Sequence, residues 1–244
     1  MTKTLLPILT AALLAGLSST HAQSLLITEV YPSGSGNSTY GVDWFELTNF
    51  GSSAVDITGW KMDDNSAAFN TSVPFGTEIT TIGAGKSVIF LETSSANFAA
   101  RVSSFNTVWF GTTTSSLLFG SYNGSGVGLS TGGDAVNIFD SLGNVLANVT
   151  FGATTAGATL DNYTGANGAL STYSAVGTNG AFTSANGLEI GSPGVVPEPS
   201  SAALLGFGTL ALLGLRRLNR KSYAPSLQPV AVAGARFRNS KFEF

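Results

Sequence analysis

Short apolar runs separated by turn residues make up most of the chain between Leu25 and Phe151. The runs LLITEVY, DWFELTNF and KSVIFLE are rich in β-branched and aromatic residues, and Gly, Ser, Asn and Asp lie between them, which is typical of short β-strands. DAVNIFDSLGNVLANVTF predicts a hairpin with strands Ala135–Asp140 and Val145–Phe151, because its Gly-Asn step tolerates positive φ. SSANFAARV predicts one turn of helix with a serine cap. The pattern therefore predicts an all-β body.

A separate apolar run lies at the N-terminus. Lys3 precedes the run from Leu5 to Leu17, and the small residues Thr20 and Ala22 follow it. This arrangement predicts a secretory signal peptide over residues 1–22, cleaved between Ala22 and Gln23. An uncleaved membrane anchor is the alternative, but the run is shorter than the roughly 20 residues that a membrane span needs.

A second apolar segment lies near the C-terminus. Val196, Pro197, Glu198 and Pro199 predict an extended, accessible linker, because proline fixes φ and removes a hydrogen-bond donor. The residues that follow predict a transmembrane helix at about 200–215. A basic cluster follows, formed by Arg216, Arg217, Arg220 and Lys221. Basic residues that flank a membrane helix stay on its cytoplasmic side, so we expect the body to lie on the opposite side of the membrane. A further basic extension occupies residues 222–244.

Charge and composition argue against several classes of function. Twelve acidic and three basic residues give residues 24–190 a net charge of −9, which argues against nucleic acid as a partner. The chain has no cysteine, and its one histidine, His21, lies in the predicted signal peptide. Disulfides, thiolate chemistry and histidine catalysis are therefore excluded for the mature protein.

The ordered runs of the body resemble the lamin-tail domain family. That family's strand order is matched by LLITEVYP, DWFELTNFG, AVDITGWKMDD, IGAGKSVIFLE, STGGDAVNIFDSLGNVL and VTFG, with a departure between Thr93 and Val127. The resemblance implies an immunoglobulin-like β-sandwich over residues 23–152. Residues 153–194 are mostly Gly, Ala, Thr, Ser and Asn, so we expect loops with one or two edge strands at most. They end in EIGSPG, which resembles the sequence that ends the domain in exported members of the family.

The segment at residues 195–221 resembles the PEP-CTERM sorting signal. VPEPSSAALLGFGTLALLGLRRLNRK contains the Pro-Glu-Pro motif, the short apolar helix and the basic cluster of that signal. The resemblance implies that Val196, Pro197, Glu198 and Pro199 form a motif recognised by an exosortase in a Gram-negative bacterium. It also implies transient residence in the inner membrane with the body in the periplasm, then delivery to the cell envelope or extracellular polysaccharide.

Candidate chemistry in the body rests on acidic residues. Glu29 and Glu46 lie in adjacent predicted strands and could act as an acid/base pair or bind a cation; we instead expect them to face solvent or accept hydrogen bonds from turn amides. The Asp63-Asp64-Asn65 sequence could bind calcium, but a solvated turn is the simpler interpretation. Asp134, after two glycines, is likewise interpreted as a turn residue.

Five aromatic residues could form a sugar-stacking face: Tyr31, Tyr40, Trp44, Trp60 and Trp109. Core packing explains Trp60 better, because it ends an alternating strand, whereas Trp109, in the segment that departs from the family pattern, stays open between the core and the surface.

The sequence as a whole predicts an exported, sorted, non-catalytic binding or structural module that needs no metal or cofactor. A carboxylate- and metal-dependent secreted hydrolase is one alternative, and an unprocessed membrane-anchored adhesin is another.

Overall fold

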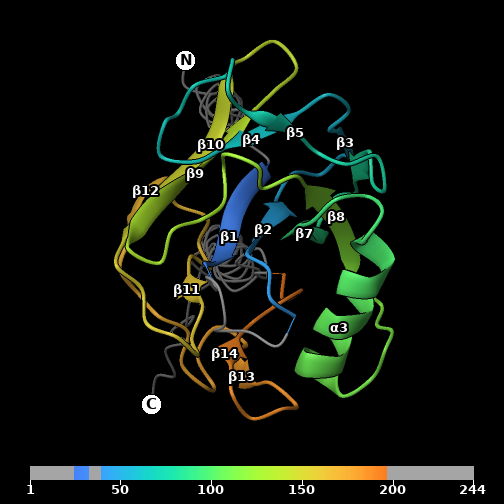
Figure 1. Cartoon of the computed structure of the whole chain (residues 1–244), viewed down its shortest axis with the longest axis vertical. Coiled ribbons are helices and arrows are strands. Elements are labelled where there is room, and N and C mark those ends of the chain that lie inside the picture. Colours follow the sequence, from blue (N-terminus) through green and yellow to red (C-terminus); the bar gives the residue numbers. More distant parts are fainter. Residues whose placement is uncertain (1–24, 33–39, 197–244) are drawn as a thin grey trace, which may run out of the picture. The chain divides into compact units, whose positions relative to one another are not determined.

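Two five-stranded sheets form the body in the computed structural model, which describes residues 25–32 and 40–196 (Figure 1). The first sheet has the order β11–β1–β2–β7–β8, formed by Leu160–Asp161, Leu25–Tyr31, Trp44–Asn49, Ser87–Glu92 and Leu118–Tyr122. The second has the order β12–β10–β9–β4–β5, formed by Gly168–Leu170, Val145–Gly152, Gly133–Phe139, Lys61–Asp63 and Val73–Pro74. Two small ribbons pair β3 (Val55–Asp56) with β6 (Thr81–Ile82), and β13 (Phe182–Thr183) with β14 (Ile190–Gly191).

The main core lies between the inner faces of the two sheets. Phe45, Leu47 and Phe90 from the first sheet pack in one buried cluster with Val136 and Val149 from the second. The alternation of side chains in a strand places these residues on one face and their neighbours in sequence on the other. The all-β prediction is therefore confirmed. The predicted hairpin is also confirmed, as β9 and β10 with Gly143 at φ +88° between them.

Helix α3 covers part of the outer face of the first sheet. It spans Phe98–Phe110, follows Asn97 without a side-chain cap, and ends at Gly111, where φ is +69°. It is longer than the single serine-capped turn that the sequence predicted. The helix connects β7 to β8, which are parallel neighbours, and parallel strands require such a crossover. Its Phe105 and Trp109 join a second buried cluster on that outer face.

The glycine-rich segment after β10 contributes more strand than we expected. β11 and β12 extend the edges of the two sheets, in agreement with the prediction of one or two edge strands. The β13–β14 ribbon is additional, and an isolated bridge between Ala158 and Ile190 links it to the approach to β11.

Several sequence predictions concern residues outside the described part of the chain. They are the signal peptide with its cleavage at Ala22 and Gln23, the helix at about 200–215, and the basic cluster. Within the described residues, no helix has the length and apolar character needed to cross a membrane.

Candidate functional site

A β-bulge brings Glu29 opposite Glu46 on the outer face of the first sheet. The register of β1 against β2 shifts between Ile27 and Glu29, so that Thr28 and Glu29 together oppose Glu46. Strict alternation would place Glu29 inward beside Ile27, and the extra residue of the bulge turns it outward. Two carboxyl side chains therefore meet as a direct cross-strand pair.

Both carboxyls are buried, each with about 1% of its surface exposed. The expectation that they face solvent is wrong, because α3 and the segment around β14 cover this face of the sheet. The alternative expectation, that they accept hydrogen bonds from turn amides, is confirmed. Glu29 Oε1 accepts the Ser192 N–H at 2.7 Å, and Glu46 Oε2 accepts the Gly194 N–H at 2.5 Å.

Hydroxyl groups complete the surroundings of the pair. The Thr159 hydroxyl donates to Glu29 Oε1, and the Thr28 hydroxyl donates to Glu46 Oε1 at 2.7 Å. A row of hydroxyl contacts continues from Thr28 through Thr48 to Ser87, at 2.8 and 2.6 Å. Buried polar groups are stable only when they are hydrogen-bonded, and these hydroxyls supply part of that bonding.

Burial raises the pKa of both carboxyls. Burial, followed by the charge of Glu46, raises the pKa of Glu29 to about 8. Burial raises the pKa of Glu46 to about 7, against the opposing effect of its hydrogen-bond donors. Glu29 Oε2 has no hydrogen-bond partner, whereas both oxygens of Glu46 accept. Two adjacent buried carboxyls cannot readily ionise together, so the pair stays at least partly protonated at neutral pH.

The Glu29–Glu46 pair binds the backbone of residues 191–194, whose sequence is GSPG. A Cβ on Gly191 would lie 2.8 Å from Glu29 Oε1 and 2.8 Å from Trp109 Cη2, so the backbone can approach the pair only as glycine. Pro193 has no N–H, and the amides on either side of it are the two that reach the carboxyls. These contacts attach residues 191–194 to the outer face of the first sheet.

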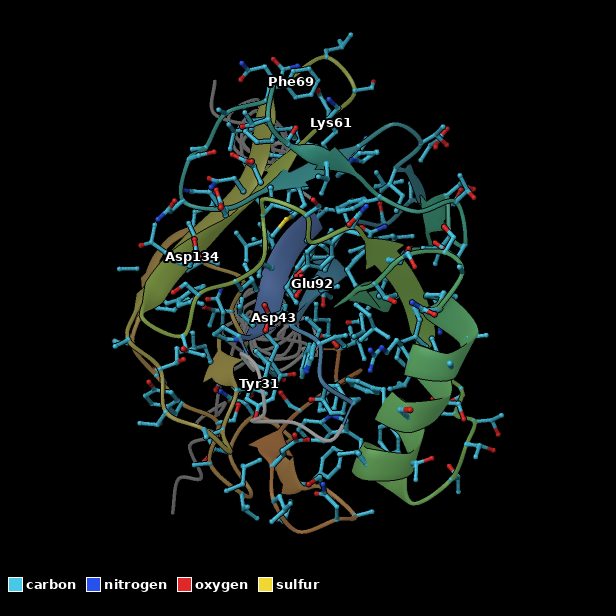
Figure 2. All side chains as sticks on the ribbon, in the orientation of Figure 1. Tyr31, Asp43, Lys61, Phe69, Glu92 and Asp134 are labelled. Carbon is cyan, nitrogen blue, oxygen red and sulfur yellow. The ribbon has the colours of Figure 1, made fainter. Side chains whose placement is uncertain are left out.

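A second carboxyl pair, which the sequence analysis missed, consists of Asp43 and Glu92. The Glu92 N–H donates to Asp43 O at 2.9 Å, which places the last residue of β7 beside the residue that precedes β2. Burial, followed by the charge of Asp43, raises the pKa of half-buried Glu92 to about 7. The hydroxyl of buried Tyr122 lies near this pair without a hydrogen-bond partner of its own. Figure 2 shows Asp43 and Glu92 together, far from Lys61 and Phe69.

The remaining acidic candidates stabilise loops. Asp63 is fully buried and its Oδ2 accepts from Ser66 Oγ and the Ala68 N–H, so the prediction of a solvated turn is wrong for this residue. Asp134 accepts three backbone amides, from Asn65, Ser130 and Ala135, in agreement with a turn role. Within the described part of the chain, no three acidic or histidine side chains converge in a way that could hold a metal ion.

The aromatic residues do not form a shared surface. Tyr31, Tyr40, Trp44 and Trp109 are each at most 1% exposed, so Trp109 lies in the core and not at the surface. The indole N–H groups of Trp44 and Trp109 both donate to the Tyr40 hydroxyl, at 3.0 and 3.3 Å. Trp60 is partly buried against the main core. Core packing therefore explains these aromatic residues, and a sugar-stacking face built from all five is excluded.

Val196 is the last described residue, and Pro197, Glu198, Pro199, Arg216, Arg217, Arg220 and Lys221 lie outside the described part.

Comparison with known families gives two matches along the chain. The Lamin Tail Domain model matches residues 18–153, and the model of the PEP-CTERM protein-sorting motif matches residues 195–221. Neither the curated proteins nor the solved structures gave a match.

Proposed function

The chain belongs to the Lamin Tail Domain family and carries a PEP-CTERM protein-sorting motif, and from this premise we propose that it is an exported substrate of an exosortase. In this proposal the β-sandwich, immunoglobulin-like as in its family, acts as a non-catalytic binding or structural module at the cell envelope or in the extracellular space. The match over residues 195–221 is the observation that carries the proposal.

The order of the parts supports this path. Signal peptidase removes residues 1–22, and a helix at about 200–215 holds the chain in the inner membrane of a Gram-negative bacterium. The arginines beyond that helix keep its end cytoplasmic, so that the body lies in the periplasm. The exosortase then recognises Pro197-Glu198-Pro199, and the released body reaches the envelope, where extracellular polysaccharide is its proposed partner.

The burial and hydrogen bonding of Glu29 and Glu46 support a non-catalytic role for the body. Glu29 and Glu46 are buried, and they use their oxygens to hold backbone amides, so they present no group to a substrate. A second candidate, a hydrolase, draws support from the half-buried Glu92 beside Asp43, because a carboxyl with a pKa near neutrality suits acid/base catalysis. Hydrolysis of envelope polysaccharide by the purified protein, lost in Glu92→Gln, would favour that candidate.

The sorting proposal is tested by changing Pro197, Glu198 and Pro199 to alanine in cells that contain the sorting enzyme. The expected result is an unprocessed protein retained in the inner-membrane fraction. A matched control changes the adjacent Ser200 and Ser201 to alanine and should be processed normally. Processing of the Pro-Glu-Pro variant at the normal rate would refute the proposal, and a wild-type protein that keeps its tail would favour an anchored adhesin.

A further inference from the structure

Residues 181–195 lie outside both five-stranded sheets and close over the outer face of the first one. We call this segment the cover; it contains the β13–β14 ribbon and the residues that follow it (Figure 1). The Ala185 N–H donates to Trp109 O at 3.2 Å, and the rings of Phe182 and Trp109 lie 5.7 Å apart. No described residue of the cover belongs to the buried cluster between the two sheets, so the cover can open without parting the sheets.

Packing and hydrogen bonds hold the cover in its closed position. Ser192 is buried, and a Cβ on Gly194 would lie 2.1 Å from Leu117 Cδ2, so the body packs directly against this part of the cover. The Ile190 N–H donates to Gly157 O at 2.8 Å. Opening breaks all of these contacts, so it requires a change that destabilises the closed state.

Three buried carboxyls lie at the boundary between the cover and the first sheet. Glu29 and Glu46 belong to the sheet, and their oxygens accept amides of the cover. Glu189 belongs to the cover and immediately precedes β14. All three are buried, and Glu29 Oε2 and both oxygens of Glu189 have no hydrogen-bond partner among the described residues. An ionised carboxyl in such a position loses its hydration without full compensation.

The groups that face the carboxyls do not neutralise them. On the side of the sheet, Asp161 of β11 adds a negative charge, and the hydroxyls of Tyr31 and Tyr40 lie near Glu189. From α3, the Arg101 guanidinium donates to the backbone carbonyl of Tyr40. Within the described residues, no lysine or arginine forms an ion pair with any of the three carboxyls.

Burial therefore favours the neutral form of each carboxyl. It raises the pKa of Glu189 to about 7; the Tyr40 hydroxyl opposes this rise, although no hydrogen bond of ordinary geometry joins the two groups. At acidic pH the boundary is neutral, whereas at alkaline pH it holds negative charges without a described cation beside them. Water solvates the same charges in the open form, so a rise in pH favours opening.

We propose that the cover is a pH-operated element of the body, closed over the first sheet while the three carboxyls are neutral and loosened as they ionise. This proposal concerns the body alone and holds whether or not the chain is sorted, so it goes beyond the proposed function. Loosening exposes the outer aromatic cluster around Trp109, which the cover contacts.

The test uses an introduced thiol, because the chain has no cysteine of its own. Ala181→Cys reports on the cover and Ala147→Cys on β10 in the main core; both alanines are buried. Thiol labelling of the full-length chain in mild detergent is followed from about pH 5.5 to about pH 8.5. Each rate is divided by that of the same thiol in the urea-unfolded chain, which cancels the pH dependence of the thiol and leaves the extent of opening.

Opening at position 181 should rise at least about a hundredfold over this range, through the combined ionisation of the three carboxyls. At the alkaline end it should exceed opening at position 147 by about tenfold or more, because a local opening needs less free energy than global unfolding.

Glu189→Gln is neutral at every pH and should reduce the rise by roughly 30-fold, the factor for a carboxyl whose pKa falls from about 7 to 4.5 on opening. Glu78→Gln changes an exposed carboxyl on another segment and is the matched control, so it should keep the full rise.

Three results would overturn the proposal. Equal opening at positions 181 and 147 would mean that global unfolding exposes both thiols. A rise that Glu189→Gln and Glu29→Gln leave unchanged would remove the role of the carboxyls. Opening at position 181 that increases with low urea as steeply as at position 147 would also exclude a local event. Hydrogen exchange of cover and β10 peptides, in the chain without introduced cysteines, repeats the comparison.

Discussion

Replacing Glu29 by glutamine should stabilise the protein, although the residue is fully buried in a hydrogen-bonded site. Glu29 Oε1 accepts from Ser192 and Thr159, and Oε2 has no partner. Glutamine keeps the accepting oxygen and places its amide where the protonated Oε2 now lies. The substitution therefore mimics the neutral acid and preserves the hydrogen bonds from Ser192 and Thr159.

The expected gain follows from the shifted pKa. The folded protein raises the pKa of Glu29 from 4.5 to about 8, so the folded state binds a proton that the unfolded chain has released at pH 7. Holding that proton costs about 3 kcal/mol at pH 7 and less than about 1 kcal/mol at pH 5, at 1.36 kcal/mol per pKa unit. Glutamine removes this cost, so Glu29→Gln should gain about 3 kcal/mol at pH 7 and little at pH 5.

Thermal unfolding of the full-length protein at the two pH values measures this difference. For a body of this size the melting temperature at pH 7 should rise by roughly 6–12 °C in Glu29→Gln. Glu46→Gln is the matched control and should gain less, because both oxygens of Glu46 accept hydrogen bonds. A gain that does not change with pH, or a loss at pH 7, would show that Glu29 is ionised and that the pair has been assigned wrongly.

Four further predictions follow from the same structure. Burial raises the pKa values of Glu29, Glu46, Glu92 and Glu189 above 4.5. The contribution of these carboxyls to the free energy of unfolding is complete below pH 4.5 and is lost as the pH rises toward 8. The melting temperature should therefore fall between pH 5.5 and pH 8.5. Trp109→Ala should destabilise the body by about 3–5 kcal/mol in denaturant titrations, and the half-buried Trp60→Ala by less; equal costs would contradict the burial described above. Gly191→Ala should cost about 1–3 kcal/mol, because its Cβ meets Glu29 and Trp109 at 2.8 Å, and an unchanged melting temperature would show that the backbone at residue 191 shifts freely. A chelator should leave the melting temperature unchanged, and loss of the transition would reveal a structural metal.

The sequence could predict the sheets because strand patterns are local. Phe45 and Leu47 alternate with Glu46, and the inward and outward faces of β2 follow directly from that alternation. The Gly143-Asn144 step likewise predicts its hairpin from the residues of the turn alone. Both features depend on neighbours in sequence, and both agree with the structure.

The candidate site was harder to predict because it depends on contacts between distant residues. The bulge at Thr28 reverses the face on which Glu29 lies, and alternation alone gives no sign of it. The burial of the pair comes from Gly191 to Gly194, more than 140 residues further along the chain. Asp43 could have been found, because it immediately precedes β2 and is two residues from the inward-facing Phe45, and an inward-facing acid needs a hydrogen-bond partner.

The burial of Trp109 was missed for a similar reason. The segment around it departs from the family pattern, and nothing local showed that its helix lies against Trp44 and Phe182. Tertiary packing determines the exposure of such a residue more strongly than the composition of its own segment.

The most direct test of the account is the intact mass of the protein recovered from the envelope or extracellular fraction of cells that contain the sorting enzyme. The recovered chain should begin at Gln23 and end near Pro199, without the apolar and basic segments that follow. Recovery of a chain that runs through to Phe244 would contradict the central claim that the protein is an exosortase substrate.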